Sequence, residues 1–242
     1  LPHWIDQHKD LADEAILVNH GSTDSSVEII KSLAPSHWRV VDSKLTDFDA
    51  IANDHEIMEW EKTLKTQFKI CLNLTEFLFC KDLKQIMEEH KHLDAIGFTA
   101  YMMVDKDQNL PLDGPLWKNR THGYLDDGSA VNSRRGRYMH TREHGDYNPG
   151  RHGCKFPNTT WKPEWNLLFA SFSPWPQAQA RKLQIQNKMI PEKSFHLGQG
   201  DQHPQTPESL NSFYQQELAK SSDLLLDKNF KLNYDSYIEK HL

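Results

Sequence analysis

Short apolar runs alternate with amphipathic segments along the first hundred residues, and this alternation limits the fold more than any other feature of the sequence. The apolar runs that predict strands cover residues 15–18, 38–41, 68–72 and 94–104. The segments with helical spacing cover residues 23–33, 50–65 and 82–90. Strands and helices in alternation predict an α/β layer fold with a largely parallel sheet flanked by helices. Such sheets bind ligands at the edge where their strands end.

The pattern changes after Val104. Residues 105–165 are rich in Gly, Pro, Asn, Asp and His and show no clear period, which predicts a long irregular region. Its Trp, Tyr and His content favours an ordered region that faces a ligand. Helices are predicted over residues 175–190 and from Pro207 onward, where Thr206 and a proline in the first turn mark a helix start. The amphipathic tail from Ser221 is expected to pack against the body.

Composition excludes several classes of protein. The chain has 242 residues, a net charge of -6 and 10% aromatic residues, which argues against global disorder, a nucleic-acid coat or a polybasic membrane binder. No apolar run approaches the ~20 residues of a membrane helix, so no transmembrane segment is expected. The start of the chain carries no signal-peptide pattern. Three cysteines without a CxxC pair fit a reducing compartment, so a cytoplasmic protein is expected.

Two polar segments follow predicted strands. Residues 17–26 run from a strand through a polar turn into a helix, where backbone N–H groups and short side chains can hold a ribose, a base or a phosphate. An ordinary capped helix after a tight turn explains the same pattern. Residues 72–78 form a strand end with alternating polar residues, and Glu76 there can contribute to a divalent-cation site. A buried strand with a polar exit is the competing interpretation.

These segments together resemble the family-two-type glycosyltransferases. Residues 19–25 (N-H-G-S-T-D-S) are similar to the family's strand-end segment D-(N/D)-G-S-T-D-x-S, and residues 4–8 (W-I-D-Q-H) resemble its E-W-I-x-x-H helix. Residues 73–78 (N-L-T-E-F-L) stand where a subgroup carries D-x-D-E-F-L, and residues 198–203 (G-Q-G-D-Q-H) resemble that subgroup's Gly-rich stretch ending in His. The resemblance is clear over residues 1–105 and looser over 175–205.

The resemblance implies one GT-A-like, Rossmann-like domain over residues 1–242. Its nucleotide-sugar-binding half would cover residues 1–105, and its acceptor-side and C-terminal half residues 106–242. The implied reaction moves a sugar from a nucleotide-sugar donor, most often a UDP-sugar, to the hydroxyl of a glycan or another acceptor.

The resemblance also implies roles for individual residues. Those expected to hold the nucleotide sugar are Asn19, Gly21, Ser22, Asp24, Asn73, Thr75, Arg181 and Lys188. Lys182 would join the last two in neutralising the leaving diphosphate. Glu76 and His203 would bind a divalent metal. An inverting enzyme needs a general base near the acceptor hydroxyl, for which Asp201 is the first candidate and Asp113 and Glu164 are rivals.

The sequence departs from the family pattern at several positions. Asn19 replaces the usual first Asp, Asn73 and Thr75 replace both Asp of the D-x-D, and the family's first strand, which precedes the helix at residues 4–8, is absent. A mixed carboxylate–imidazole shell suits Mn²⁺ better than Mg²⁺, so Mn²⁺ is expected with Mg²⁺ as the alternative. The lost charges keep open a second hypothesis, a catalytically silent module that binds a nucleotide or a glycan.

A basic segment gives a third hypothesis. Residues 134–155 carry six Lys or Arg residues opposed only by Glu143 and Asp146, with His140, His144 and His152 between them. Such a segment can bind an anionic acceptor or nucleic acid, or it can be a solvated loop. The overall negative charge argues against nucleic acid. The histidines match no regular zinc-ligand spacing.

Overall fold

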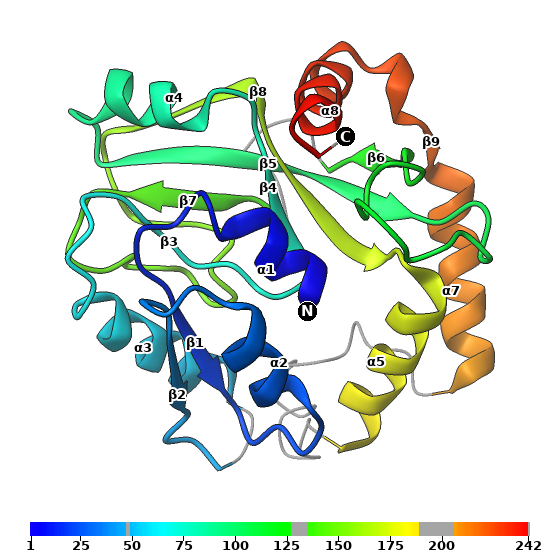
Figure 1. Cartoon of the computed structure of the whole chain (residues 1–242), viewed down its shortest axis with the longest axis horizontal. Helices are drawn as coiled ribbons and strands as arrows, with labels where there is room; N and C mark the ends of the chain where they lie inside the picture. Colours follow the sequence, from blue (N-terminus) through cyan, green and yellow to red (C-terminus); the bar gives the residue numbers. More distant parts are fainter. Residues whose placement is uncertain (47–48, 127–134, 189–205, 242) are drawn as a thin grey trace.

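A small parallel ladder forms one side of the molecule (Figure 1). The computed structural model describes residues 1–46, 49–126, 135–188 and 206–241, with backbone only at 185–188. Strand β1 (Ile16–Asn19) pairs in parallel with β2 (Arg39–Asp42), and helix α2 (Ser26–Leu33) connects them. Helix α3 (Ala50–Glu61) follows; Asp49 caps its start by accepting hydrogen bonds from the backbone of Ile51 and Ala52.

A second, larger sheet is built around one long central strand. All ten residues of β5 (Ala95–Val104) are buried, as expected for a strand covered on both faces. One edge of β5 pairs with β7 (Arg137–His140) and then with β6 (His122–Leu125). Its other edge pairs with β8 (Thr159–Phe172). The outer strands are β3 (Lys69–Ile70), β4 (Glu76–Phe79) and β9 (Ser222–Asp223).

The expectation of a mostly parallel sheet is wrong for this larger sheet. Only β5 and β8 run parallel in it; β4 is antiparallel to β8, and β6 and β7 are antiparallel to β5. Two of these strands, β6 and β7, come from the region predicted to be irregular. Each has only four residues, too few to show a regular alternation of apolar and polar side chains. They form strands because they pair with the edge of β5. The α/β class itself is confirmed.

Helices cover both parts of the molecule. Helix α1 (Pro2–His8) lies between the small ladder and the larger sheet; its Trp4 and Gln7 side chains donate hydrogen bonds to the carbonyls of Glu76 and Leu78. Helix α4 (Leu83–His90) and helix α8 (Lys228–His241) pack on the larger sheet, with η1 (Leu224–Leu226) leading into α8. The amphipathic tail therefore packs on the body, as expected.

Helices α5 (Trp175–Lys188) and α7 (Pro207–Lys220) continue from the far end of β8 (Figure 1). The predicted start of α7 is confirmed, because the Thr206 hydroxyl accepts from the backbone N–H of Ser209 in a capping box. In the described part of the chain, no helix combines the length and apolar character needed to cross a membrane.

Candidate functional site

The polar turn after β1 is held by the side chain of its first residue. The Asn19 amide donates to Asp42 at 2.8 Å, and its carbonyl oxygen accepts from the backbone N–H of Ser22 at 2.9 Å. Gly21 adopts φ +67°, a left-handed conformation that glycine tolerates without strain. The Asp24 carboxylate accepts from the backbone N–H of Ser26, and hydrogen bonding by the Ser26 side chain, followed by this backbone bond, lowers the pKa of Asp24. The predicted turn therefore exists, and Gly21, Ser22 and Asp24 are exposed to solvent.

The second polar segment is a turn that precedes a strand, which corrects the expected strand end. Strand β3 ends at Ile70, and Glu76 begins β4. The Glu76 side chain is completely buried, and its carboxylate accepts from the backbone and side-chain nitrogens of Asn73. The same carboxylate receives two bonds from Arg137 on β7, at 2.8 Å from Nε and 2.5 Å from Nη2. Glu76 and Arg137 thus form a buried bidentate ion pair.

A second buried guanidinium extends this network. Arg151 forms an ion pair with Asp54 on α3, and its Nη2 donates to the Asn73 side-chain oxygen at 2.9 Å. Beside it, the His152 Nδ1 faces Arg137 Nη1 at 2.5 Å. Burial, followed by the nearby arginines Arg137 and Arg135, lowers the pKa of His152 to about 3. His152 is therefore neutral, and its Nδ1 acts as the acceptor.

The sequence-predicted cations of α5 lie at the other side of the same turn. Ala170 on β8 donates its backbone N–H to the Thr75 carbonyl at 2.7 Å. Arg181 Nη2 donates to the Ala170 carbonyl at 3.1 Å, and Lys182 Nζ donates to the Ser171 hydroxyl at 3.0 Å. The tertiary structure therefore brings Arg181 and Lys182 to the segment that contains Asn73 and Thr75, although more than 100 residues separate them in sequence.

These two cations have no carboxylate within salt-bridge distance among the described residues. Burial lowers the pKa of Arg181 to about 10. Burial, then the neighbouring Arg181 and Arg135, lowers the pKa of Lys182 to about 8, while Glu217 on α7 acts in the opposite direction. Charges that are shielded from water are normally paired, so two neighbouring half-buried cations held by neutral oxygens mark a place that favours an anion.

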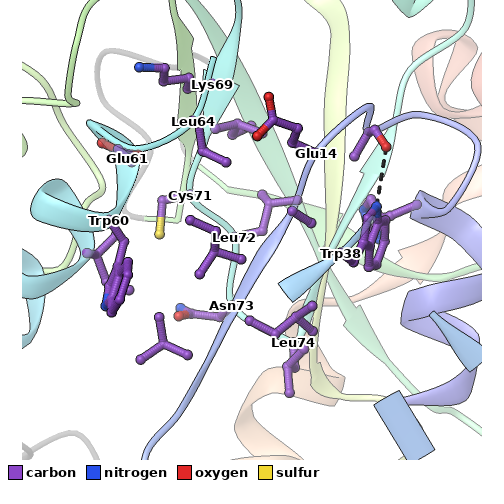
Figure 2. Close-up of a pocket in the computed structure, with 18 of the residues that line it drawn as sticks. Glu14, Trp38, Trp60, Glu61, Leu64, Lys69, Cys71, Leu72, Asn73 and Leu74 are labelled. Carbon is purple, nitrogen blue, oxygen red and sulfur yellow. Dashed lines mark hydrogen bonds between the residues drawn. The ribbon is translucent and has the colours of Figure 1, made fainter. Parts of the chain in front are cut away.

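A cavity of about 460 Å³ connects the turn after β1 to the Asn73 turn. Its walls come from β1, α2, α3 and the segment at residues 66–74, and Figure 2 shows Trp60 and Trp38 on opposite sides with Leu72, Asn73 and Leu74 between them. Asn19, Ser22, Asn73 and Arg151 all line this cavity. Three of the predicted residues of the two turns, Asn19, Ser22 and Asn73, thus line one cavity, whereas Gly21, Asp24 and Thr75 are not among its lining residues.

Among the described residues, three polar atoms in the wall of this cavity are buried without a hydrogen-bond partner. They are His20 Nδ1, next to Asn19, Arg151 Nε, next to Asn73, and Trp60 Nε1 on α3. A buried polar atom that lacks a partner is costly, because it has lost its hydrogen bonds to water. The polar end of the cavity therefore offers unused hydrogen-bonding capacity to a ligand.

The residues at Glu76 do not fit a metal ion in this arrangement. Four hydrogen bonds already occupy the Glu76 carboxylate oxygens, and the Asn73 side-chain oxygen is bound by Arg151. No group of three His, Cys, Asp or Glu side chains suited to a metal occurs within the described ranges. Glu76 is therefore part of an ion pair rather than an available ligand.

Several predicted residues cannot be placed at the site. Asp201 and His203 lie outside the described residues, as does the side chain of Lys188 at the end of α5. Asp113 is exposed in the segment before β6. Glu164 lies six residues before Ala170 on β8, which is roughly 20 Å along the strand. That separation argues against Glu164 as a base at the Asn73–Thr75 turn.

The basic segment is not an open cationic surface. Arg137 and Arg151 point inward to Glu76 and Asp54, Arg142 pairs with Asp94 at 2.6 Å, and Lys155 lies 3.8 Å from Asp146. His140 is buried against Tyr147 and Glu61. Arg134 lies outside the described residues. Four of the six basic residues of the segment are therefore paired with carboxylates, which reduces the positive charge that the segment offers to an anion.

Sequence reasoning missed the importance of Arg137 and Arg151 to the site. Both were visible only as members of a charge cluster. The signal that could have found Arg137 is its place in the run R-Y-M-H, because an arginine in a buried strand needs a buried acid as its partner.

No protein-family model matches the chain, and no curated protein matches it. Among solved structures, the chain is similar to the crystal structure of S. aureus TarS 1–349, a glycosyltransferase, with 12% sequence identity and a TM-score of 0.41. The match covers 79% of this chain and 64% of that chain, so this chain spans less than two thirds of that structure.

Proposed function

We propose that the protein transfers a sugar from a nucleotide-diphosphate sugar, a UDP-sugar in the first instance, to a hydroxyl acceptor. The observation that carries this proposal is the meeting of the Asn73–Thr75 turn with two half-buried cations, Arg181 and Lys182, that lack a paired carboxylate among the described residues. A diphosphate is an anion of the right kind for such a place. Asn19, Ser22, His20 and Arg151 at the polar end of the cavity would bind the nucleoside.

The chemistry follows from where charge develops. In glycosyl transfer the bond between the anomeric carbon and the diphosphate oxygen breaks, and the acceptor oxygen bonds to that carbon. The leaving diphosphate gains negative charge, and cations placed beforehand stabilise it more in the transition state than in the ground state. Arg181 and Lys182 supply this charge. Asp201 remains the proposed general base for an inverting reaction, with Asp113 as its rival.

A silent binding module is the second candidate. Two observations favour it. The ion pair with Arg137 prevents the Glu76 carboxylate from binding a metal, and the side chains of Asn73 and Thr75 are neutral. Such a module would bind the nucleotide sugar at the same residues without turning it over.

The test is UDP release from a panel of UDP-sugars, which needs no knowledge of the acceptor because many transferases hydrolyse their donor slowly. We expect release with one sugar, and loss of release in Lys182→Gln. Lys84→Gln is the matched control, because Lys84 is an exposed lysine on α4. Binding of a UDP-sugar without release would favour the silent module. Absence of both binding and release would refute both candidates.

A further inference from the structure

The candidate donor site has a fixed cation at the position where a carboxylate-bound metal was expected. Arg137 binds both oxygens of Glu76 in a side-by-side arrangement, with both side chains almost completely buried. Asn73 donates two further hydrogen bonds to the same carboxylate. An ionised carboxylate offers about four acceptor positions, so these four bonds leave no oxygen of Glu76 free.

A metal ion at Glu76 would have to displace Arg137. The displaced guanidinium would keep its bond to the Gly150 carbonyl at 3.1 Å and its contact with neutral His152. It would lose Glu76, its anionic partner among the described residues. A buried charge left without its counter-ion is strongly destabilising. The next oxygen along the turn, on the Asn73 side chain, is held by Arg151, which is itself anchored to Asp54. The turn is therefore closed to a cation by two guanidinium groups.

The opposite side of the turn has the complementary property. Arg181 and Lys182 carry positive charge where only a carbonyl and a hydroxyl oxygen contact them within the described residues. Lys182 Nζ also lies 4.5 Å from the centre of the Phe172 ring, a contact that holds the ammonium without neutralising it. An anion at this place would find positive charge supplied by the protein itself.

We propose that this site binds the diphosphate of its nucleotide through Arg181 and Lys182 with no divalent cation, while the Arg137–Glu76 pair closes the position that a metal would use. This inference rests on the proposed function and deepens it. It predicts a nucleotide site that is indifferent to chelators and to added Mn²⁺ or Mg²⁺.

The experiment measures UDP binding to the full chain by calorimetry, in EDTA and in excess Mn²⁺. We expect dissociation constants that agree within about threefold between the two arms. A second readout is the electron paramagnetic resonance signal of free Mn²⁺. This signal should be no lower with protein and UDP together than with UDP alone. Lys182→Gln should weaken binding at least about tenfold in both arms, and Lys84→Gln should leave it unchanged.

The possible failures are distinguishable. Binding that appears only with Mn²⁺, together with protein-dependent depletion of free Mn²⁺, would overturn the metal-free inference and leave the proposed function standing. Equal binding of UDP by the wild type and by Lys182→Gln would overturn the assigned cations. No UDP binding in either arm would refute the proposed function, and the inference would fall with it. Circular dichroism of each variant establishes that it is folded.

Discussion

Two pairs of basic residues lie on opposite sides of one turn and are used in opposite ways. Arg137 and Arg151 are each bound to a buried carboxylate, Glu76 or Asp54. Arg181 and Lys182 are bound to neutral oxygens, and burial lowers the pKa of both. Carboxylates of the protein neutralise the charges of the first pair. No carboxylate neutralises the second pair among the described residues, which lowers the stability of the fold but leaves positive charge for an anion.

This difference shows that the number of basic residues in a segment does not indicate whether their charges are available to a ligand. The density of charge along the sequence pointed to residues 134–155, yet four of the six basic residues there are paired with carboxylates: Arg137, Arg142, Arg151 and Lys155. Arg181 and Lys182, which no carboxylate neutralises among the described residues, lie instead on α5, a helix with no comparable density of charge. Pairing therefore separates structural from functional cations, and the predictions below test that separation.

The largest effect is expected at the buried pair. Glu76→Gln leaves Arg137 charged and unpaired, and should lower the free energy of unfolding by about 3–5 kcal/mol. Arg137→Met should cost a similar amount by leaving Glu76 unpaired. The double variant Glu76→Gln with Arg137→Met should lose much less than the sum of the single losses, because neither charge remains. Urea denaturation of the four proteins measures this, and additive losses would contradict a direct pair.

A smaller effect of opposite sign is expected at Lys182. Burial lowers the pKa of this lysine from 10.5 to about 8, so the folded state holds the proton less well than the unfolded state. Lys182→Gln removes that penalty and should raise the free energy of unfolding by roughly 1–3 kcal/mol. The same variant should lose UDP binding. Lower stability together with lost binding would mean that Lys182 is a structural residue.

The pH dependence of stability provides a second test of the charge on Lys182. Between pH of about 8 and 10.5 the unfolded chain keeps the Lys182 proton while the folded chain releases it, so this group makes stability rise with pH over that interval. Other groups titrate there too, so the measurement is the difference between wild type and Lys182→Gln. The stability gained by the variant at neutral pH should shrink towards zero near pH 10.5. A gain that stays constant across the interval would exclude the buried charge as its cause.

The smallest effect is expected at an exposed pair. Arg142 lies 2.6 Å from Asp94, but its side chain is 54% exposed, so water and salt screen the interaction. Arg142→Gln should change the free energy of unfolding by no more than about 1 kcal/mol. The measurement is the shift in urea midpoint beside Glu76→Gln. A loss as large as that of Glu76→Gln would show that burial is not what distinguishes the two pairs.

Local patterns determined much of the fold. The strands at β1, β2 and β5 and the helices α2, α3, α4, α5 and α7 begin within a few residues of the predicted positions. Their signals lie in neighbouring residues, such as the apolar run of β5 and the Thr206–Pro207 start of α7. The polar turn at Asn19–Ser22 is equally local, because the Asn19 side chain bonds the backbone three residues on. Apolar periodicity, caps and turn residues act over a few residues, so the sequence displays them directly.

The direction and partners of the strands required the tertiary structure. β6 and β7 are four-residue strands that depend on the edge of β5, and β4 runs antiparallel to β8 across 90 or so residues of chain. The residues of a strand do not specify which other strand it will pair with. The expected parallel sheet therefore held for β1 and β2, where a single helix connects adjacent strands, and failed beyond them.

By itself, then, the sequence determined most of the helices, several of the strands and the polar turn after β1, and its resemblance to a family pointed to Arg181 and Lys182 as candidate anion-binding residues. Only the tertiary structure decided that Glu76 meets Arg137, 61 residues away, and that Asn73 meets Arg151, 78 residues away. The physical reason is that the sequence gives the type of a charged residue but not whether another group neutralises its charge. Its effect depends on which groups the fold places within hydrogen-bond distance and on whether water can reach them.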